Sequence, residues 1–186
     1  NTSLFDEQLA ATLSFFDLSQ TNVAAADPNN ANFVVPIGEQ SSRGIELDIT
    51  GEILPGWNVL TGVSLLDAEI EESANFAAGT TPPNAPETTA NLWTTYEVQS
   101  GDLQGLGFGL GLFYVGERQG DEANSFTLDE YFRTAAAVYY RQENFRVGLN
   151  VRNLFDVDYF ENGGLARRGA TPGEPLSVVG SVSITF

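Results

Sequence analysis

The last twelve residues, 175–186, read PLSVVGSVSITF and decide the fold class. Leu176, Val178, Val182, Ile184 and Phe186 alternate with residues that are mostly serines, so an extended strand here has one apolar and one mostly small, polar face. An apolar edge strand in a soluble sheet invites aggregation, whereas a closed membrane barrel has lipid outside and no free edge. The stretch therefore predicts a transmembrane β-strand, with a soluble β-sandwich as the alternative.

The composition excludes several classes of function. The net charge of −17 disfavours nucleic-acid binding, which requires clustered basic residues. The chain contains no Cys and no His, so the common catalytic triads and zinc sites are excluded, and we expect no enzyme activity. No apolar run reaches the roughly 20 residues of a transmembrane helix, yet 42% of the residues are hydrophobic. Short segments of alternating hydrophobicity reconcile these observations and favour a membrane β-barrel.

The same alternation recurs along the chain and predicts eight antiparallel strands. The clearest segment is 43–53, where apolar residues at 45, 47 and 49 face away from Glu46 and Asp48. Segment 57–70 is ambiguous, because either of its faces could be the apolar one. The predicted strands are residues 8–19, 43–53, 57–70, 88–98, 105–118, 127–141, 145–154 and 176–186.

Long and short connections alternate between the predicted strands. Residues 20–40 are expected to form a long polar loop, whereas 54–56 and 142–144 are expected to form short turns. Such alternation is typical of a barrel whose short turns face the periplasm and whose long loops face outside. The aromatic residues that then fall near the short-turn rim, as an interfacial girdle requires, are Trp57, Tyr96 and Tyr140.

Three glycines occupy successive inner positions of segment 105–118. They are Gly107, Gly109 and Gly111. Glycine weakens a strand and usually marks a bend or a close approach of another group to the backbone. Something packed inside a barrel would supply such an approach.

Several motifs, in this order and spacing, resemble the carboxyl half of TonB-dependent siderophore receptors along nearly the whole chain. The longest are SRGIELD at residues 42–48 and NVRNLFD at residues 150–156, which is followed by Tyr159. The other matching stretches are GWN at 56–58, LDAE at 66–69, NAP at 84–86, FYVGER at 113–118 and the terminal Phe186.

The resemblance implies an all-β, antiparallel transmembrane barrel in the bacterial outer membrane, with about 22 strands around a plugged lumen. It implies a receptor that imports ferric siderophores with energy from the TonB complex. Residues 1–186 would supply the last eight strands, so we expect the plug and the TonB-contacting segment to be missing and this chain alone not to transport. The plug would be what the inner glycines face.

The resemblance also implies the partners. They are a ferric siderophore, the TonB complex through the missing amino-terminal part, outer-membrane lipid, and the barrel-assembly machinery, which would read Phe186 as its terminal signal. Iron would be carried only inside the siderophore, so no cofactor and no protein metal ligand are expected. A divalent cation held by Asp156, Asp158 and Glu161 is the alternative that the residues leave open.

Two other functions remain alternatives to the receptor. One is a self-contained eight-stranded outer-membrane barrel with a structural or adhesion role, and the other is a soluble acidic β-domain. Apolar stripes on several strands count against the soluble domain.

Aromatic and arginine residues of the predicted outer loops are the candidates for ligand contact, because they suit an aromatic or anionic chelate. Each could instead be a local packing anchor. These candidates are Phe33, Phe76, Arg118, Phe126, Tyr159, Phe160, Arg167 and Arg168. A second set of charged residues is expected to form a polar network in the lumen, where arginines pair with acids: Glu46, Asp48, Arg133, Arg146 and Arg152.

Overall fold

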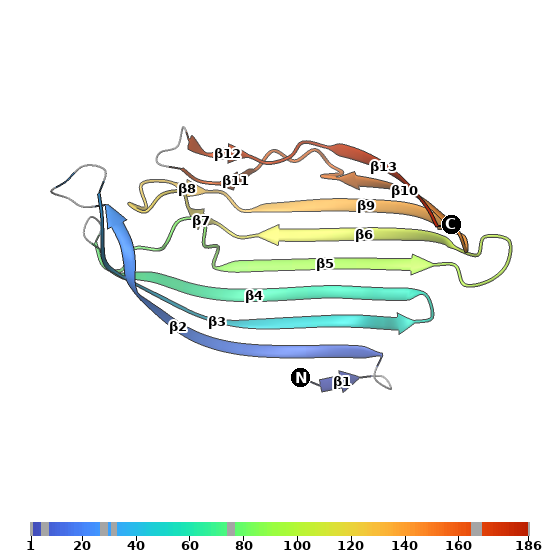
Figure 1. Cartoon of the computed structure of the whole chain (residues 1–186), viewed down its shortest axis with the longest axis horizontal. Coiled ribbons are helices and arrows are strands. Elements are labelled where there is room, and N and C mark those ends of the chain that lie inside the picture. The colour runs from blue at the N-terminus through green and yellow to red at the C-terminus, as the bar shows by residue number, and fades with distance from the viewer. Residues whose placement is uncertain are drawn as a thin grey trace.

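The computed structural model describes residues 2–4, 8–26, 30, 33–73, 77–164 and 169–185. In these residues, eight long strands follow one another in a single antiparallel sheet, to which the short strand β1 (Thr2–Leu4) adds at one edge (Figure 1). The predicted number of long strands and their antiparallel pairing are thereby confirmed. The long strands are β2 (Leu9–Ala26), β3 (Val34–Leu54), β4 (Trp57–Glu72), β5 (Thr88–Glu97), β6 (Leu106–Val115), β9 (Tyr131–Arg141), β10 (Phe145–Arg152) and β13 (Ser177–Ile184).

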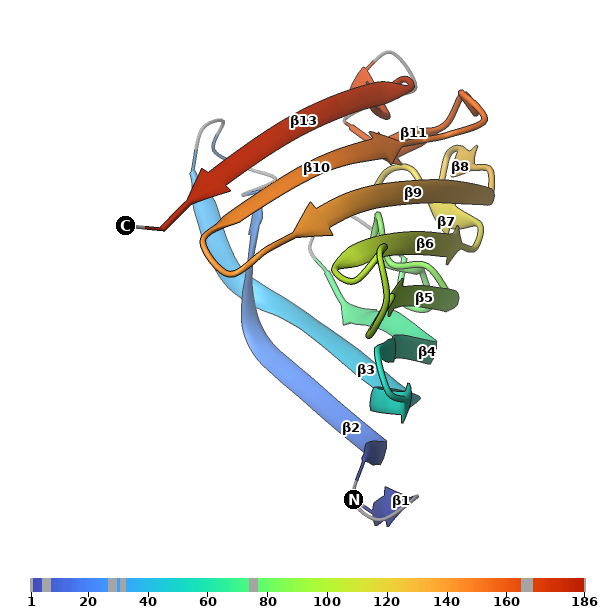
Figure 2. The ribbon, with the colours of Figure 1, turned by 90° about the vertical axis from the view of Figure 1, so that its right-hand side faces the viewer.

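The sheet is curved and open. Figure 2 shows an arc with β13 at one end and β1 at the other. Within the described part of the chain, β13 pairs with β10 alone, and no ladder joins it to β1 or β2. The strands therefore form a segment of barrel wall and do not close into a small barrel.

Cross-strand pairing places the predominantly apolar phase of each of the eight long strands on one face, which we call the apolar face. Leu47 of β3 lies opposite Leu13 of β2 and Val63 of β4. This register settles the ambiguous segment 57–70 by placing its odd-numbered residues on the apolar face. At the other end of the sheet, Val147 of β10 lies opposite Val182 of β13. The opposite face, which we call the polar face, carries all five charged residues predicted to line the lumen.

The prediction of a long loop at residues 20–40 is wrong. Strand β2 continues to Ala26 and β3 begins at Val34. Gln20 lies opposite Gln40, and the pairing continues through register shifts near Val23 to Ala26 and Val34. The polar residues of this stretch indicated a loop, because strands inside a membrane alternate between apolar and polar residues. A ladder that extends beyond the membrane has water on both faces, so it forms without that alternation.

Two predicted strands are too long at their loop ends. Residues 118–119 and 127–128 leave the main sheet and pair with each other as β7 (Arg118–Gln119) and β8 (Thr127–Leu128). A second small sheet pairs β11 (Phe160–Asn162) with β12 (Thr171–Pro172). Both small sheets lie at the same end of the wall (Figure 1). One belongs to the connection between β6 and β9, and the other to the connection between β10 and β13.

The two ends of the sheet differ as predicted. One end, which we call the short-turn end, carries the connections 55–56, 98–105 and 142–144, and Trp57 lies opposite Tyr96 there on the apolar face. At the other end, the described residues of 77–87, 116–130 and 153–176 form what we call the loop layer. No helix within the described residues is sufficiently long and apolar to cross a membrane.

The inner glycines of β6 are covered by aromatic rings of the neighbouring strands. A β-carbon added at Gly107 would lie 2.1 Å from the Tyr139 ring, and one added at Gly111 would lie 2.6 Å from the Trp93 ring. The close approach is therefore supplied by the wall itself. The interpretation that something inside the barrel causes it is corrected, because the rings of β5 and β9 already occupy that space.

Candidate functional site

The loop layer is held together by side chains that bond to the backbone of a neighbouring loop. Asn124 accepts a hydrogen bond from the Thr81 amide at 2.9 Å and donates to the Thr81 carbonyl at 2.8 Å. The Asn84 side chain accepts a hydrogen bond from the Gly163 amide at 2.6 Å. Three connections that are distant in sequence are therefore tied into one layer.

Arg118 is the buried cation of this layer, with only 4% of its surface exposed. Its guanidinium donates hydrogen bonds to the backbone carbonyls of Phe160 and Glu161. These charge-assisted bonds attach the β6–β9 connection to the β10–β13 connection.

Asn153 ends β10 and organises the loop that follows. It is fully buried, and its side-chain amide donates to the carbonyls of Val157 and Glu174 at 2.9 and 3.0 Å while its oxygen accepts from the Val157 amide at 2.9 Å. Its φ of 47° is left-handed, a conformation that Asn tolerates better than most residues. The predicted strand 145–154 therefore stops at Arg152.

A stack of alternating arginines and aromatic rings runs from the loop layer to the polar face of the sheet. Arg118 lies over the Tyr131 ring at 5.4 Å, and that ring lies 4.3 Å from the Tyr159 ring. Arg133 follows, 5.7 Å from the centre of Tyr159 and 5.2 Å from that of Phe113. All of these cation–π distances are within the roughly 6 Å at which the attraction is significant.

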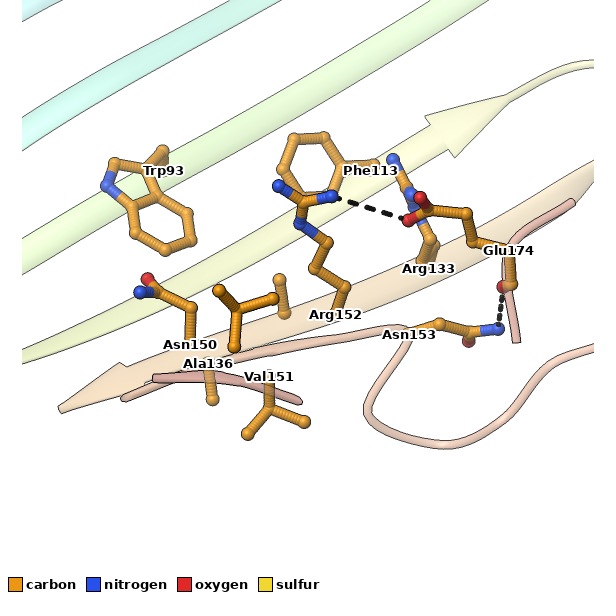
Figure 3. A pocket seen from close by; sticks show the side chains of 11 residues that line it. Trp93, Phe113, Arg133, Ala136, Asn150, Val151, Arg152, Asn153 and Glu174 are labelled. Carbon is orange, nitrogen blue, oxygen red and sulfur yellow. Dashed lines mark hydrogen bonds and ion pairs between the residues drawn. The ribbon is translucent and has the colours of Figure 1, made fainter. Parts of the chain in front are cut away.

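A pocket of about 350 Å³ opens on the polar face where this stack ends (Figure 3). It lies next to the loop layer, and strands β5, β6, β9, β10 and β13 all contribute to its lining. Its polar and aromatic lining residues include Trp93, Phe113, Arg133, Asn150, Arg152 and Glu174.

The pocket carries two guanidinium groups and one carboxylate. Arg152 Nη1 lies 3.6 Å from Glu174 Oε2, a loose ion pair between two half-exposed side chains. Arg133 donates a long, 3.3 Å hydrogen bond to the Tyr159 hydroxyl, and its buried Nε has no hydrogen-bond partner. No described carboxylate forms an ion pair with Arg133. The pocket therefore has a surplus of positive charge in a chain whose net charge is −17.

The structure buries three of the predicted ligand-contact residues. Arg118 holds the loop layer, Tyr159 belongs to the stack, and Phe126 packs against Gly120. These positions correspond to packing anchors. Phe33 and Phe160 are exposed and remain predictions. The residues that lie outside the described part of the chain are Phe76, Arg167, Arg168 and Phe186.

The predicted lumen residues lie on the polar face but are not all brought together. Arg133 and Arg152 share the pocket, whereas Arg146 stacks on the Tyr139 ring at 4.5 Å. Glu46 and Asp48 of β3 form no ion pair with these arginines among the described residues. The ion pairs present there join Arg43 to Asp67, Arg141 to Glu97 and Arg152 to Glu174.

Asp156, one of the three acidic residues that could have held a divalent cation, has a structural role. One oxygen of the Asp156 carboxylate accepts the Leu176 amide at 2.8 Å, which closes the loop between β10 and β13. In the part of the chain that the structure describes, no group of three or more acidic residues is placed to hold a metal ion.

Sequence reasoning missed Trp93, Asn153 and Glu174. Trp93 lies on the inner face of its strand, whereas the strand was predicted from the apolar residues of its outer face. Glu174 lies in a loop that contains no recognisable motif. Asn153 was within a quoted motif, NVRNLFD. An Asn directly after an alternating strand is a signal for a left-handed turn, and that signal would have found it.

Comparison with known proteins gives a consistent result. A family model described as "TonB dependent receptor-like, beta-barrel" matches residues 2–154. The metal-pseudopaline receptor CntO of Pseudomonas aeruginosa is 33% identical over 98% of this chain and 26% of its own length. The ferrichrome outer membrane transporter/phage receptor of Escherichia coli is 34% identical over 83% of this chain and 21% of its own.

A solved structure has the same fold. The crystal structure of the siderophore receptor PiuA from Acinetobacter baumannii superimposes with a TM-score of 0.84 at 30% identity, covering 98% of this chain and 27% of that one. The chain therefore spans about a quarter of the length of these relatives.

Proposed function

The chain belongs to the TonB-dependent receptor family of outer-membrane β-barrels, and we propose that it is part of the wall of a receptor that imports ferric siderophores. The names of its relatives, which include a ferrichrome transporter and a metal-pseudopaline receptor, support this class of ligand. None of these names describes an enzyme, and we propose a purely transporting role.

The observation that carries the proposal is the two-faced sheet with a cationic pocket on its polar face. The apolar face suits lipid, and the polar face suits a lumen through which a hydrophilic chelate passes. The pocket adjoins the loop layer, which is where a ligand that enters from outside would first meet the wall.

In this proposal the parts have separate roles. The loop layer faces outside. Phe160 of this layer, together with Phe33, Phe76, Arg167 and Arg168, contacts the siderophore. A plug and the TonB contact belong to parts of the receptor other than this sequence. The barrel-assembly machinery reads Phe186. Iron travels inside the chelate, and the receptor keeps no cofactor of its own.

The test is uptake of radioactive iron by cells that carry or lack the gene for the whole receptor. Under iron limitation, we expect deletion to abolish uptake of at least one ferric siderophore and the intact gene to restore it. Restoration should require a functional TonB complex. Equal uptake of every chelate in the two strains would contradict the proposal.

A further inference from the structure

The pocket on the polar face has a composition that selects for the charge and shape of a ligand. We propose that it binds the anionic, aryl-bearing part of the chelate, with Arg152 and Arg133 holding acidic oxygens and with Trp93 and Phe113 facing a planar ring. This inference rests on the proposed function and assigns both a site and a class of chelate to it.

Arg152 is available to a ligand. Its contact with Glu174 is 3.6 Å long, and the two side chains are 57% and 51% exposed. Pairs of this kind contribute little, so an incoming anion replaces Glu174 at low cost. A guanidinium binds a carboxylate or a similar pair of oxygens through two parallel hydrogen bonds.

Arg133 adds a second cation that is already oriented. Its guanidinium lies 5.2 Å from the centre of the Phe113 ring and 5.7 Å from that of Tyr159, so its rotamer is restricted before any ligand arrives. Its buried Nε has no hydrogen-bond partner, which leaves part of its bonding capacity unused. Preorganisation of this kind lowers the entropic cost of binding.

The apolar part of the pocket suits a flat group. Figure 3 shows Arg152 between Trp93, which lies beside Asn150 at one end of the pocket, and Glu174 at the other end. The Trp93 ring lies close over Gly111 and so offers an aromatic surface next to the cations. A neutral chelate without aryl groups offers no charged oxygens to the arginines and no planar group to these rings. The pocket therefore favours anionic chelates that carry aryl groups.

The test uses the full-length receptor in detergent and two ferric chelates of similar size, an anionic tris-catecholate and a neutral tris-hydroxamate. We expect Arg152→Gln and Arg133→Gln each to weaken binding of the anionic chelate about tenfold. Glu174→Gln removes the competing carboxylate and should strengthen it about threefold. Arg43→Gln is the matched control, because Arg43 pairs with Asp67 in an exposed position outside the pocket, and it should change neither affinity.

The outcomes separate the two proposals. Unchanged anionic binding in Arg152→Gln, or equal losses for both chelates, would overturn the pocket assignment while the receptor function stands. Unchanged anionic binding in Glu174→Gln together with lower thermal stability of Arg152→Gln would also overturn it, by indicating that another segment of the receptor docks here. If the unsubstituted receptor binds and imports no ferric chelate, the proposed function itself fails.

Discussion

The sheet and the loop layer bury their side chains in opposite ways. On the apolar face of the sheet, Phe15 and Val182 are 70% and 72% exposed. In the loop layer, Asn153 is fully buried and Arg118 nearly so. Among the described residues, the wall has no second protein layer over its apolar face, whereas the loop layer has a small core of its own. These two polar side chains are buried because each donates hydrogen bonds to backbone carbonyls of the loops around it.

The largest test of this contrast is Asn153→Ala. The substitution removes all three side-chain hydrogen bonds of a fully buried residue and leaves its partners unsatisfied at a left-handed position. We expect the loop between β10 and β13 to lose about 4 kcal/mol of local stability. Hydrogen exchange at the Val157 amide in the full-length receptor measures this loss.

Asn153→Asp is the matched control for that substitution. It keeps the oxygen that accepts the Val157 amide, but it replaces the donating NH2 by a buried carboxylate oxygen that faces the carbonyls of Val157 and Glu174. Exchange should therefore accelerate at least as much as in Asn153→Ala. Equal protection of Val157 in all three proteins would show that Asn153 does not organise the loop.

The wall is tested by placing the same charge on its two faces. Leu110 lies on the apolar face and Leu60 on the polar face, and both are partly exposed. Leu110→Arg should destabilise the receptor in bilayers by about 3 kcal/mol, because a lipid-facing charge near the midplane is costly. Leu60→Arg should cost much less in the same urea unfolding experiment. Similar losses would mean that the faces are assigned incorrectly.

The glycine stripe gives a smaller, steric effect. Gly107→Leu drives a side chain into the Tyr139 ring, and we expect a loss of about 2 kcal/mol from overpacking. Gly180→Ala is the control, because no atom lies within 4 Å of an added β-carbon there. Unfolding of the two variants in bilayers should differ clearly. Comparable stability would contradict the close ring contact.

The smallest expected effect is electrostatic and lies in the loop layer. The hydroxyl and the backbone amide of Ser125 donate to the Asp121 carboxylate and lower the pKa of that group. A lowered pKa means that the ionised carboxylate stabilises the turn above its unfolded pKa and that this contribution is lost as pH falls through the folded pKa. Hydrogen exchange at the Ser125 amide should accelerate below about pH 4.

Ser125→Ala sharpens that measurement, because it removes the hydroxyl bond and keeps the backbone bond. In this variant, the pKa of Asp121 should return part of the way to its ordinary value. An Asp121 carboxyl that titrates with the same pKa in both proteins would show that the Ser125 hydroxyl has no influence.

The alternation of the sequence was enough to predict the wall. Val147 and Val182 occur at the phase that the membrane requires, and the ladder between β10 and β13 places them opposite each other. Period-2 patterns fix register wherever one face must be apolar. Beyond the apolar band this constraint ends, which is why the continuation of β2 and β3 was not predicted.

The pocket and the loop layer were predicted only in part, because alternation within a strand does not predict contacts between strands or loops. Arg133 and Arg152 could be placed on the inner face from their phase alone, because each strand fixes its own alternation. That they share one pocket, while Arg146 does not, depends on how neighbouring strands are offset. The roles of Arg118 and Asn153 depend on loop backbone that has no periodic pattern, so burial there could not be inferred from residue type.

The rings that cover the β6 glycines also determine how far the wall projects into the space on its polar face. A side chain that stands upright on a barrel strand narrows the passage by its own height. Trp93 and Tyr139 instead lie close over Gly111 and Gly107, so two large aromatic residues add contact area along the wall while taking little from its radius. At these strands, the polar face therefore carries flat aromatic rings where upright side chains would otherwise stand.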